Sequence, residues 1–147
     1  RMMVRVLAYC IDAHEQLTFT KGISAPGEPD LWQHTLDGQI CLWVEVGEPS
    51  FDRIKKSVRA AKNVKIYSLN TKSDVWWDQL EKKLLDLCLW VYRLQWTEVQ
   101  ALAALVQRTM NFSITINGNA AYIAAELGQT EISWVVLKSG PDELHRG

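Results

Sequence analysis

The sequence has few residues of the types that bind zinc, and those it has are badly spaced for a metal site. It contains three cysteines and three histidines among 147 residues. No two cysteines form a CxxC pair, and the histidines lie far from the cysteines and from one another, so the spacing of a zinc site is absent. We expect reduced thiols in the cytosol, with Cys10, Cys41 and Cys88 each buried as a small hydrophobic side chain. A cysteine–histidine nucleophile is not supported.

Glycine-rich phosphate motifs are missing as well. Neither GxGxxG nor GxxxxGKS/T occurs, so a Rossmann or P-loop nucleotide enzyme is not favoured. No apolar stretch approaches the roughly 18 uninterrupted residues that a spanning helix needs, and we expect no membrane segment. The formal net charge is -1 at pH 7. Since domains that bind nucleic acid through bulk charge have a strong basic excess, a nucleic-acid site here must be a local basic patch.

The chain has the size of one domain. About 150 residues is usual for a single domain with a sizeable core, and the sequence has no internal repeat, low-complexity segment or linker. It begins at Arg1 and not at Met, without the cleavage site of a signal peptide. We interpret this start as a truncation and expect residues 1–147 to form a single cytoplasmic domain that lacks its N-terminal segment. The sequence identifies no protein partner.

The spacing of apolar residues predicts the order α-β-β-β-α-β for the first half of the chain. The pattern favours a helix over residues 2–14, strands over 17–21, 30–36 and 40–46, a helix over 51–62 and a strand over 64–69. Asp37-Gly38 is typical of a hairpin turn. The short helical connection predicts a right-handed crossover that lays the fourth strand parallel to the third.

The second half is predicted to contain two helices, one strand and an antiparallel meander. A helix capped by Thr71 or Ser73 runs to about residue 84, a strand covers 87–94, and a capping box at Thr97 opens a helix to about residue 108. Residues 112–116, 122–127 and 132–137 alternate as three strands, with hairpin turns at Asn117-Gly118 and Gly128-Gln129. The fold class is therefore α/β, with a mixed central sheet and the meander in the same or an adjoining sheet.

One carboxylate, Glu45, interrupts the apolar run Ile40–Val46. Because the run indicates a strand buried on both faces, this charge must be compensated, usually by a cation. The preceding strand carries Asp30, after Pro29, and two carboxylates on neighbouring strands form an oxygen site for Mg²⁺ or Mn²⁺ that activates water against a phosphodiester. This is the order of the PD-(D/E)xK nucleases, except that Gly47 replaces their lysine.

Several segments resemble the YaeQ family of small bacterial proteins. They are RMMVRVLAY (1–9), LTFTKGIS (17–24), EPDLW (28–32), LWVEVGEP (42–49), RIKKSVRAA (53–61), WW (76–77) and QRTM (107–110). The resemblance covers nearly the whole chain. It implies a variant of the restriction-endonuclease-like fold, with an additional antiparallel part to which an N-terminal segment contributes strands. It implies no reaction.

Carried onto this chain, the nuclease pattern gives Asp30 and Glu45 as catalytic metal ligands and Glu28 as a third candidate ligand. The cation absent at Gly47 could come from Lys55 or Lys56 on the following helix, because a lysine stem is long and flexible. The structural alternative is that Glu45 pairs with a lysine or arginine of that helix and that Asp30 caps a turn.

A basic arc follows on the same helix, made of Lys55, Lys56, Arg59 and Lys62. Such an arc can contact the phosphates of nucleic acid beside a metal site, or it can be an ordinary solvated helix face. Two functions therefore compete. One is a Mg²⁺-dependent phosphodiesterase or nuclease of undefined substrate, and the other is a catalytically degenerate nuclease fold that binds nucleic acid or protein.

Overall fold

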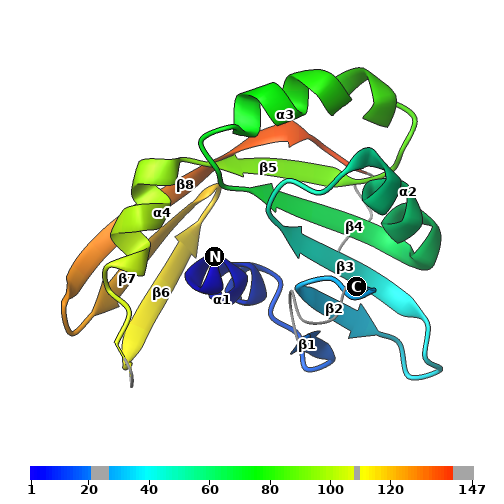
Figure 1. Ribbon diagram of the computed structural model, residues 1–147. Coiled ribbons are helices and arrows are strands. Elements are labelled where there is room, and N and C mark those ends of the chain that lie inside the picture. Colours follow the sequence, from blue (N-terminus) through cyan, green and yellow to red (C-terminus); the bar gives the residue numbers. More distant parts are fainter. Residues whose placement is uncertain (21–26, 108–109, 141–147) are drawn as a thin grey trace.

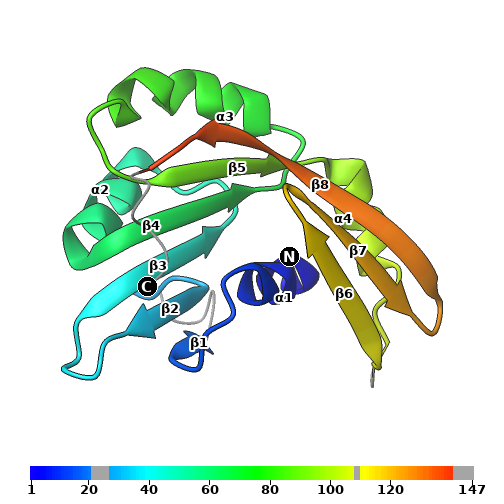
Figure 2. The ribbon, with the colours of Figure 1, turned by 180° about the vertical axis from the view of Figure 1, so that it is seen from behind.

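An open, curled sheet of eight strands organises the molecule in the computed structural model, which describes residues 1–20, 27–107 and 110–140 (Figures 1 and 2). The elements are α1 (Met2–Ile11), β1 (Leu17–Phe19), β2 (Leu31–His34), β3 (Ile40–Val46), α2 (Phe51–Ala60), β4 (Ala61–Ser68), α3 (Ser73–Leu80), the 3₁₀ helix η2 (Glu81–Leu84), β5 (Trp90–Leu94), α4 (Trp96–Ala103), β6 (Phe112–Asn117), β7 (Ala120–Ala125) and β8 (Gly128–Lys138). Within these ranges no helix is long and apolar enough to cross a membrane.

The sheet is mixed, with the strand order β1-β2-β3-β4-β5-β8-β7-β6. β3, β4 and β5 run parallel to one another, and every other neighbouring pair is antiparallel. The predicted α-β-β-β-α-β order of the first half and the parallel pairing of β3 with β4 are confirmed. The predicted meander is also confirmed, and it lies in the same sheet, because β8 pairs with β5. Its two turns are displaced from the predicted Asn117-Gly118 and Gly128-Gln129: they lie at residues 118–119 and 126–127, because Asn117 still pairs in β6 and Gly128 already pairs in β8.

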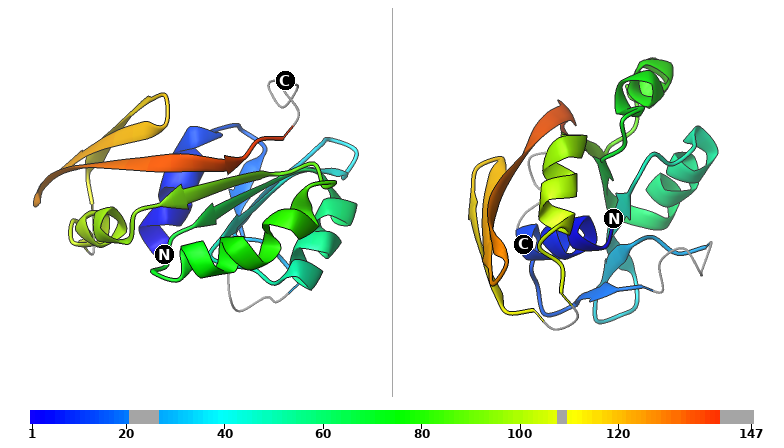
Figure 3. Two further views of the ribbon diagram at one scale, coloured as in Figure 1. Left: turned by 90° about the horizontal axis from the view of Figure 1, so that it is seen from above. Right: turned by 60° about the vertical axis from the view of Figure 1, so that its left-hand side comes forward.

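Helices cover both faces of the sheet (Figure 3). α1 and α4 pack with the inner face of the curl, in a core that includes residues of β3, β4 and the meander. α2 and α3 lie side by side on the opposite face and close a second, smaller core. Strand alternation on β3 sends Val44 and Val46 to the first core and Trp43 to the second. Glu45, two residues from Trp43, therefore points toward the α2 side.

Several predicted element ends are wrong. α2 ends at Ala60 and not near residue 62, because pairing with β3 already begins at Ala61. The helix expected over 73–84 is divided into α3 and η2, and the strand expected from residue 87 begins at Trp90. Thr97 does not open a capping box, since Gln95 is the N-cap of α4 and the Glu98 carboxylate accepts a hydrogen bond from the Ser133 N–H at 2.9 Å. Lys21 and Arg108, at two predicted ends, fall outside the described residues.

The cysteines are less uniform than expected. All three are free thiols; Cys10 and Cys41 are half-buried, whereas Cys88 is exposed. The expectation of a buried small hydrophobic side chain is therefore wrong for Cys88. This residue precedes β5 in the turn after η2, where the chain leaves the helical layer before it reaches the sheet.

The inner face buries a lysine that the sequence pattern did not reveal. Lys65 on β4 is 5% exposed, and its Nζ lies 2.7 and 2.8 Å from the two carboxylate oxygens of Asp12, just after α1. The pattern of residues 64–69 predicts a strand but does not say what covers this lysine. The strand is covered on both faces, by α2 on one side and by α1 on the other, so the lysine requires a carboxylate partner.

Two tyrosines lie on this inner face and predict sensitivity to alkaline pH. Tyr67 and Tyr92 stack with ring centres 5.1 Å apart. Burial, with the Asp12 charge as a lesser cause, raises the pKa of Tyr67 well above its usual value and that of Tyr92 from 10.0 to about 12. A folded-state pKa above that of the unfolded chain means that the neutral phenol stabilises the fold. This contribution to the free energy of unfolding is complete below about pH 10 and is lost as the pH rises toward 12.

We expect the melting temperature to fall over this range, and to fall less in Tyr92→Phe. Equal slopes for the variant and the wild type would contradict this assignment.

Candidate functional site

The two carboxylates singled out in the sequence come from neighbouring strands at one end of the sheet. Asp30 directly precedes β2, which is antiparallel to β3, so Asp30 lies beside the last residues of β3. Its backbone N–H donates to the Val44 carbonyl oxygen at 2.9 Å, and the Val46 N–H donates to the Asp30 Oδ2 at 2.7 Å. The hairpin at Asp37-Gly38 produces this juxtaposition, since it returns the chain along β2.

Two arginines of the α1 region bind Asp30, which is only 1% exposed. The Arg1 Nη2 donates to its Oδ1 at 2.6 Å, and the Arg5 Nε lies 3.2 Å from the same oxygen. The Arg5 Nε–H makes no hydrogen bond, so that contact is electrostatic, while the Arg5 Nη2 donates to the Asp30 backbone oxygen at 2.8 Å. The arginines reach Asp30 together because residues four apart share a helix face. The alternative that Asp30 only caps a turn is therefore incomplete. Its carboxylate joins β3 to the α1 region by accepting hydrogen bonds from both.

Glu45 is held by different groups, which come from β3 and α2. Its Oε2 accepts hydrogen bonds from the Trp43 Nε1 at 2.9 Å and from the Arg53 Nε at 2.8 Å. Burial raises the pKa of Glu45 and outweighs the opposing effects of Trp43 and Arg53, and the Asp30 charge raises it further. Glu28, the third candidate ligand, is joined to this group through its backbone, since the Arg53 Nη2 donates to its carbonyl oxygen at 2.6 Å.

The cation beside Glu45 is Arg53, which confirms the structural alternative that Glu45 pairs with a lysine or arginine of the following helix. The nuclease hypothesis had considered Lys55 and Lys56 instead. α2 starts shortly after β3 ends, so the first turn of the helix lies nearest to the end of the strand. Arg53 is in that turn, and the position of the Ser50 N-cap could have indicated it. Sequence reasoning also missed Arg1 and Arg5 as partners of Asp30, because they come from a helix far away in the chain.

Gly47 explains why the lysine of the nuclease pattern is absent. Its φ is +131°, a conformation that side-chain-bearing residues rarely adopt. A Cβ at this position would lie 3.4 Å from the Arg1 Nη1, which donates to the Val46 carbonyl oxygen. The backbone conformation therefore disfavours a side chain at position 47, and an arginine from the α1 region lies beside it.

These residues do not fit a Mg²⁺ ion. Three guanidinium groups contact the two carboxylates, so the cluster carries more positive than negative charge before any metal is added. Both oxygens of Asp30 and the Oε2 of Glu45 already accept contacts from N–H donors. Throughout the described part of the chain, no group of three or more His, Cys, Asp or Glu residues is arranged to hold a metal ion. Mg²⁺ prefers carboxylates that are free of competing cations.

The predicted basic arc lies on the exposed side of α2. Lys56, Arg59 and Lys62 are exposed and Lys55 is half-buried, and none of the four belongs to an ion pair among the residues that the structure describes. Lys62 belongs to β4 and not to the helix as expected, so it extends the arc beyond the end of α2. The four cations lie on the same side of the sheet as Glu45 and Arg53.

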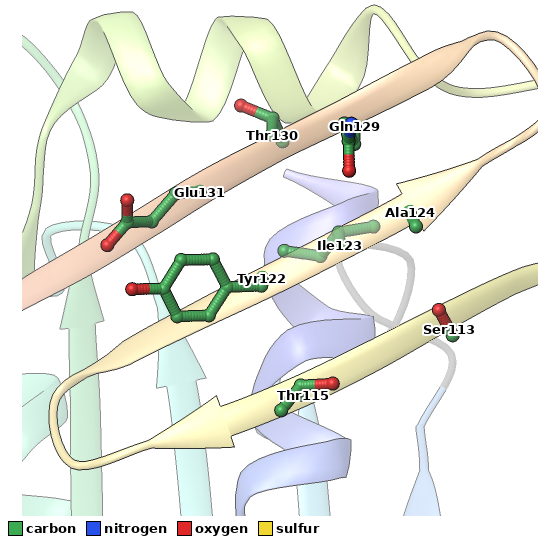
Figure 4. Close-up of a pocket in the computed structure, with 8 residues that line it drawn as sticks. All are labelled: Ser113, Thr115, Tyr122, Ile123, Ala124, Gln129, Thr130 and Glu131. Carbon is green, nitrogen blue, oxygen red and sulfur yellow. The ribbon is translucent and has the colours of Figure 1, made fainter.

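A separate hollow of about 320 Å³ lies on the meander, away from the carboxylates (Figure 4). It is lined by Ser113, Thr115, Tyr122, Ile123, Ala124, Gln129, Thr130 and Glu131. Tyr122 and Glu131 face each other across β7 and β8, and their hydrogen bond raises the pKa of Tyr122. Because its lining has no lysine or arginine and one carboxylate, the hollow is not suited to phosphate.

Comparisons with known proteins agree on one family. The family described as "YaeQ protein" matches residues 1–134. The chain is 34% identical over 134 residues to "Uncharacterized protein YaeQ" of Salmonella typhi, covering 90% of this chain and 74% of that protein. It is 32% identical over 135 residues to the protein of the same name from Escherichia coli (strain K12), covering 90% and 75%. The crystal structure of YaeQ protein from Xanthomonas axonopodis pv. citri matches with a TM-score of 0.90 at 28% identity, covering 95% of this chain and 80% of that one. The crystal structure from Pseudomonas syringae gives 0.89 at 27% identity, covering 95% and 78%.

Proposed function

The chain belongs to the YaeQ family, and we propose that it is a nucleic-acid-binding protein with a nuclease-like core in which arginines neutralise the carboxylates of the PD-(D/E)xK pattern. The α-β-β-β-α-β order, with β3 parallel to β4, supports a restriction-endonuclease-like variant of the α/β fold. The charge balance of the cluster carries the proposal that it binds without metal-dependent cleavage. Two carboxylates meet three guanidinium groups, and no lysine side chain is accommodated at Gly47.

The ligand class follows from the exposed cations of α2 and the start of β4. Lys55, Lys56, Arg59 and Lys62 have no carboxylate partner within the described ranges, whereas Arg53 of the same helix is committed to Glu45. Phosphates of a nucleic-acid backbone are suitable partners for such cations, and contacts of this kind position a protein without reading sequence. Measured binding to nucleic acid distinguishes this role from that of a solvated helix face.

A Mg²⁺- or Mn²⁺-dependent phosphodiesterase is the second candidate. It is favoured by one observation: Asp30 and Glu45 come from neighbouring strands at the same end of the sheet, close enough for the Asp30 charge to raise the pKa of Glu45. This candidate requires both carboxylates to leave their arginines when the metal binds. Lys55 or Lys56 would then supply the missing cation.

The deciding experiment measures binding and cleavage of labelled single-stranded and duplex oligonucleotides, with EDTA, Mg²⁺ or Mn²⁺. We expect binding in EDTA, no cleavage with either metal, and no rise in melting temperature on adding Mg²⁺, because a ligand raises stability only if it binds the folded state. Metal-dependent cleavage that disappears in both Asp30→Asn and Glu45→Gln would establish the phosphodiesterase instead.

Two substitutions of Glu45 separate its charge from its role as a hydrogen-bond acceptor. Glu45→Gln keeps an oxygen for the Trp43 N–H and removes a carboxylate whose burial raises its pKa, so we expect the free energy of unfolding at pH 7 to change by less than about 1 kcal/mol. Glu45→Ala leaves the indole N–H without an acceptor and should cost about 2–3 kcal/mol. Urea denaturation checks both values. A loss from Glu45→Gln as large as that from Glu45→Ala would show that the ion pair with Arg53 dominates.

A further inference from the structure

Two lysines from different elements converge on one aromatic ring on the outer face of the α2 and α3 layer. The Nζ of Lys55 on α2 lies 5.3 Å from the centre of the Phe51 ring, and the Nζ of Lys83 on η2 lies 5.4 Å from it. η2 continues α3, which lies beside α2 on this side of the sheet (Figure 3). One ring therefore attracts two ammonium groups from elements that β4 and α3 separate in the chain.

No carboxylate offsets the charge of this pair. Neither Lys55 nor Lys83 belongs to an ion pair in the part of the chain that the structure describes, and the acidic side chains of the same two elements, Asp52 and Glu81, are exposed and equally absent from its ion pairs. Two unpaired ammonium groups at one ring repel each other. A polyanion bound at this ring would offset that repulsion and gain attraction from both charges.

We propose that Lys55, Phe51 and Lys83 form a clamp for the phosphate backbone of a nucleic-acid strand, an inference that rests on the proposed function and extends its surface from α2 to η2. The ring attracts both cations and restricts where they lie, so less side-chain freedom is lost when a phosphate binds. Counterions held near the lysines are released at the same time, which makes the binding depend on salt.

The neighbouring charges favour a polyanion over a small anion. Lys56, Arg59 and Lys62 are exposed beyond Lys55, so cations continue from the clamp along α2 and the start of β4. A row of phosphates can contact several of these in turn, whereas a single carboxylate or free phosphate contacts only a few. Lysine ammonium groups act as point charges and cannot read bases as a planar, bidentate guanidinium does, so the clamp binds without sequence preference.

The test is the salt dependence of binding to a labelled single strand and its duplex, measured by fluorescence anisotropy in EDTA. For Lys83→Ala we expect weaker binding to every sequence and a slope of log K against log salt that is smaller by about 1, the value for one lost phosphate contact. Lys82→Ala is the matched control: it removes the same charge from the same 3₁₀ helix but touches no ring. Phe51→Leu keeps every charge and should weaken binding several-fold, because it removes the ring that holds the lysines together.

The outcomes separate this inference from the proposed function. Wild-type protein that binds neither oligonucleotide overturns the proposed function and the clamp with it. Wild-type binding with equal losses in Lys83→Ala and Lys82→Ala, and none in Phe51→Leu, leaves the function standing but overturns the clamp, since net charge would then explain the data. Circular dichroism and melting of each variant show whether it is folded, and Lys83→Arg should keep the wild-type slope.

Discussion

Replacing Asp12 by alanine is expected to lower the free energy of unfolding by about 3–5 kcal/mol, because it strands the buried ammonium group of Lys65. Both carboxylate oxygens of Asp12 accept from this lysine, at 2.7 and 2.8 Å. Without them, Lys65 has to lose its proton, draw water into the core or displace α1. Urea denaturation monitored by tryptophan fluorescence measures the loss.

A double substitution provides the control for this prediction. Lys65→Met fills the same space with an apolar side chain. As a single substitution it keeps Asp12, whose carboxylate is partly exposed and can contact water. Asp12→Ala combined with Lys65→Met should therefore recover most of the stability lost in Asp12→Ala, because buried ion pairs can be replaced by apolar groups at little cost. If Asp12→Ala alone costs less than about 1 kcal/mol, the lysine is not held in the core by this pair.

Asp30→Ala is expected to cost about 2–4 kcal/mol. It leaves the N–H of Val46 without an acceptor and removes the partner shared by Arg1 and Arg5. The two arginines are partly exposed and can turn to water, which keeps the loss below that of a fully buried charge pair. Asp30→Asn should cost less, since an amide oxygen can still accept from Val46.

Whether Asp30→Ala lowers or raises the free energy of unfolding distinguishes the nucleic-acid-binding protein from the metal-dependent phosphodiesterase. In an acidic metal site without its ion, removing one carboxylate relieves repulsion and leaves stability equal or higher. An unchanged or increased free energy of unfolding in Asp30→Ala, together with a Mg²⁺-dependent rise in the melting temperature of the wild type, would contradict the arginine-neutralised cluster and favour the phosphodiesterase.

Most of the elements could be predicted because their signals are local. The apolar run Ile40–Val46 is found as β3 with the expected bounds, Ser50 caps α2 through the Arg53 N–H, and Asp37-Gly38 turns the chain between β2 and β3. Gly118 joins β6 to β7 with Asn119, one residue later than predicted, since glycine accepts the positive φ that this turn requires. Strand periodicity and turn residues act over a few positions, so they can be recognised without the rest of the chain.

By itself the sequence determined the order of the elements, the family, and the two carboxylates that meet where β2 begins and β3 ends. Only the tertiary structure decided which cations meet them. Arg1 reaches Asp30, and Lys65 reaches Asp12, across distant stretches of chain. Periodicity gives the face of an element on which a side chain lies, but not what covers that face. Because a buried charge is stable only beside its partner, the packing of α1 and α2 against the sheet determined the chemistry that these carboxylates can perform.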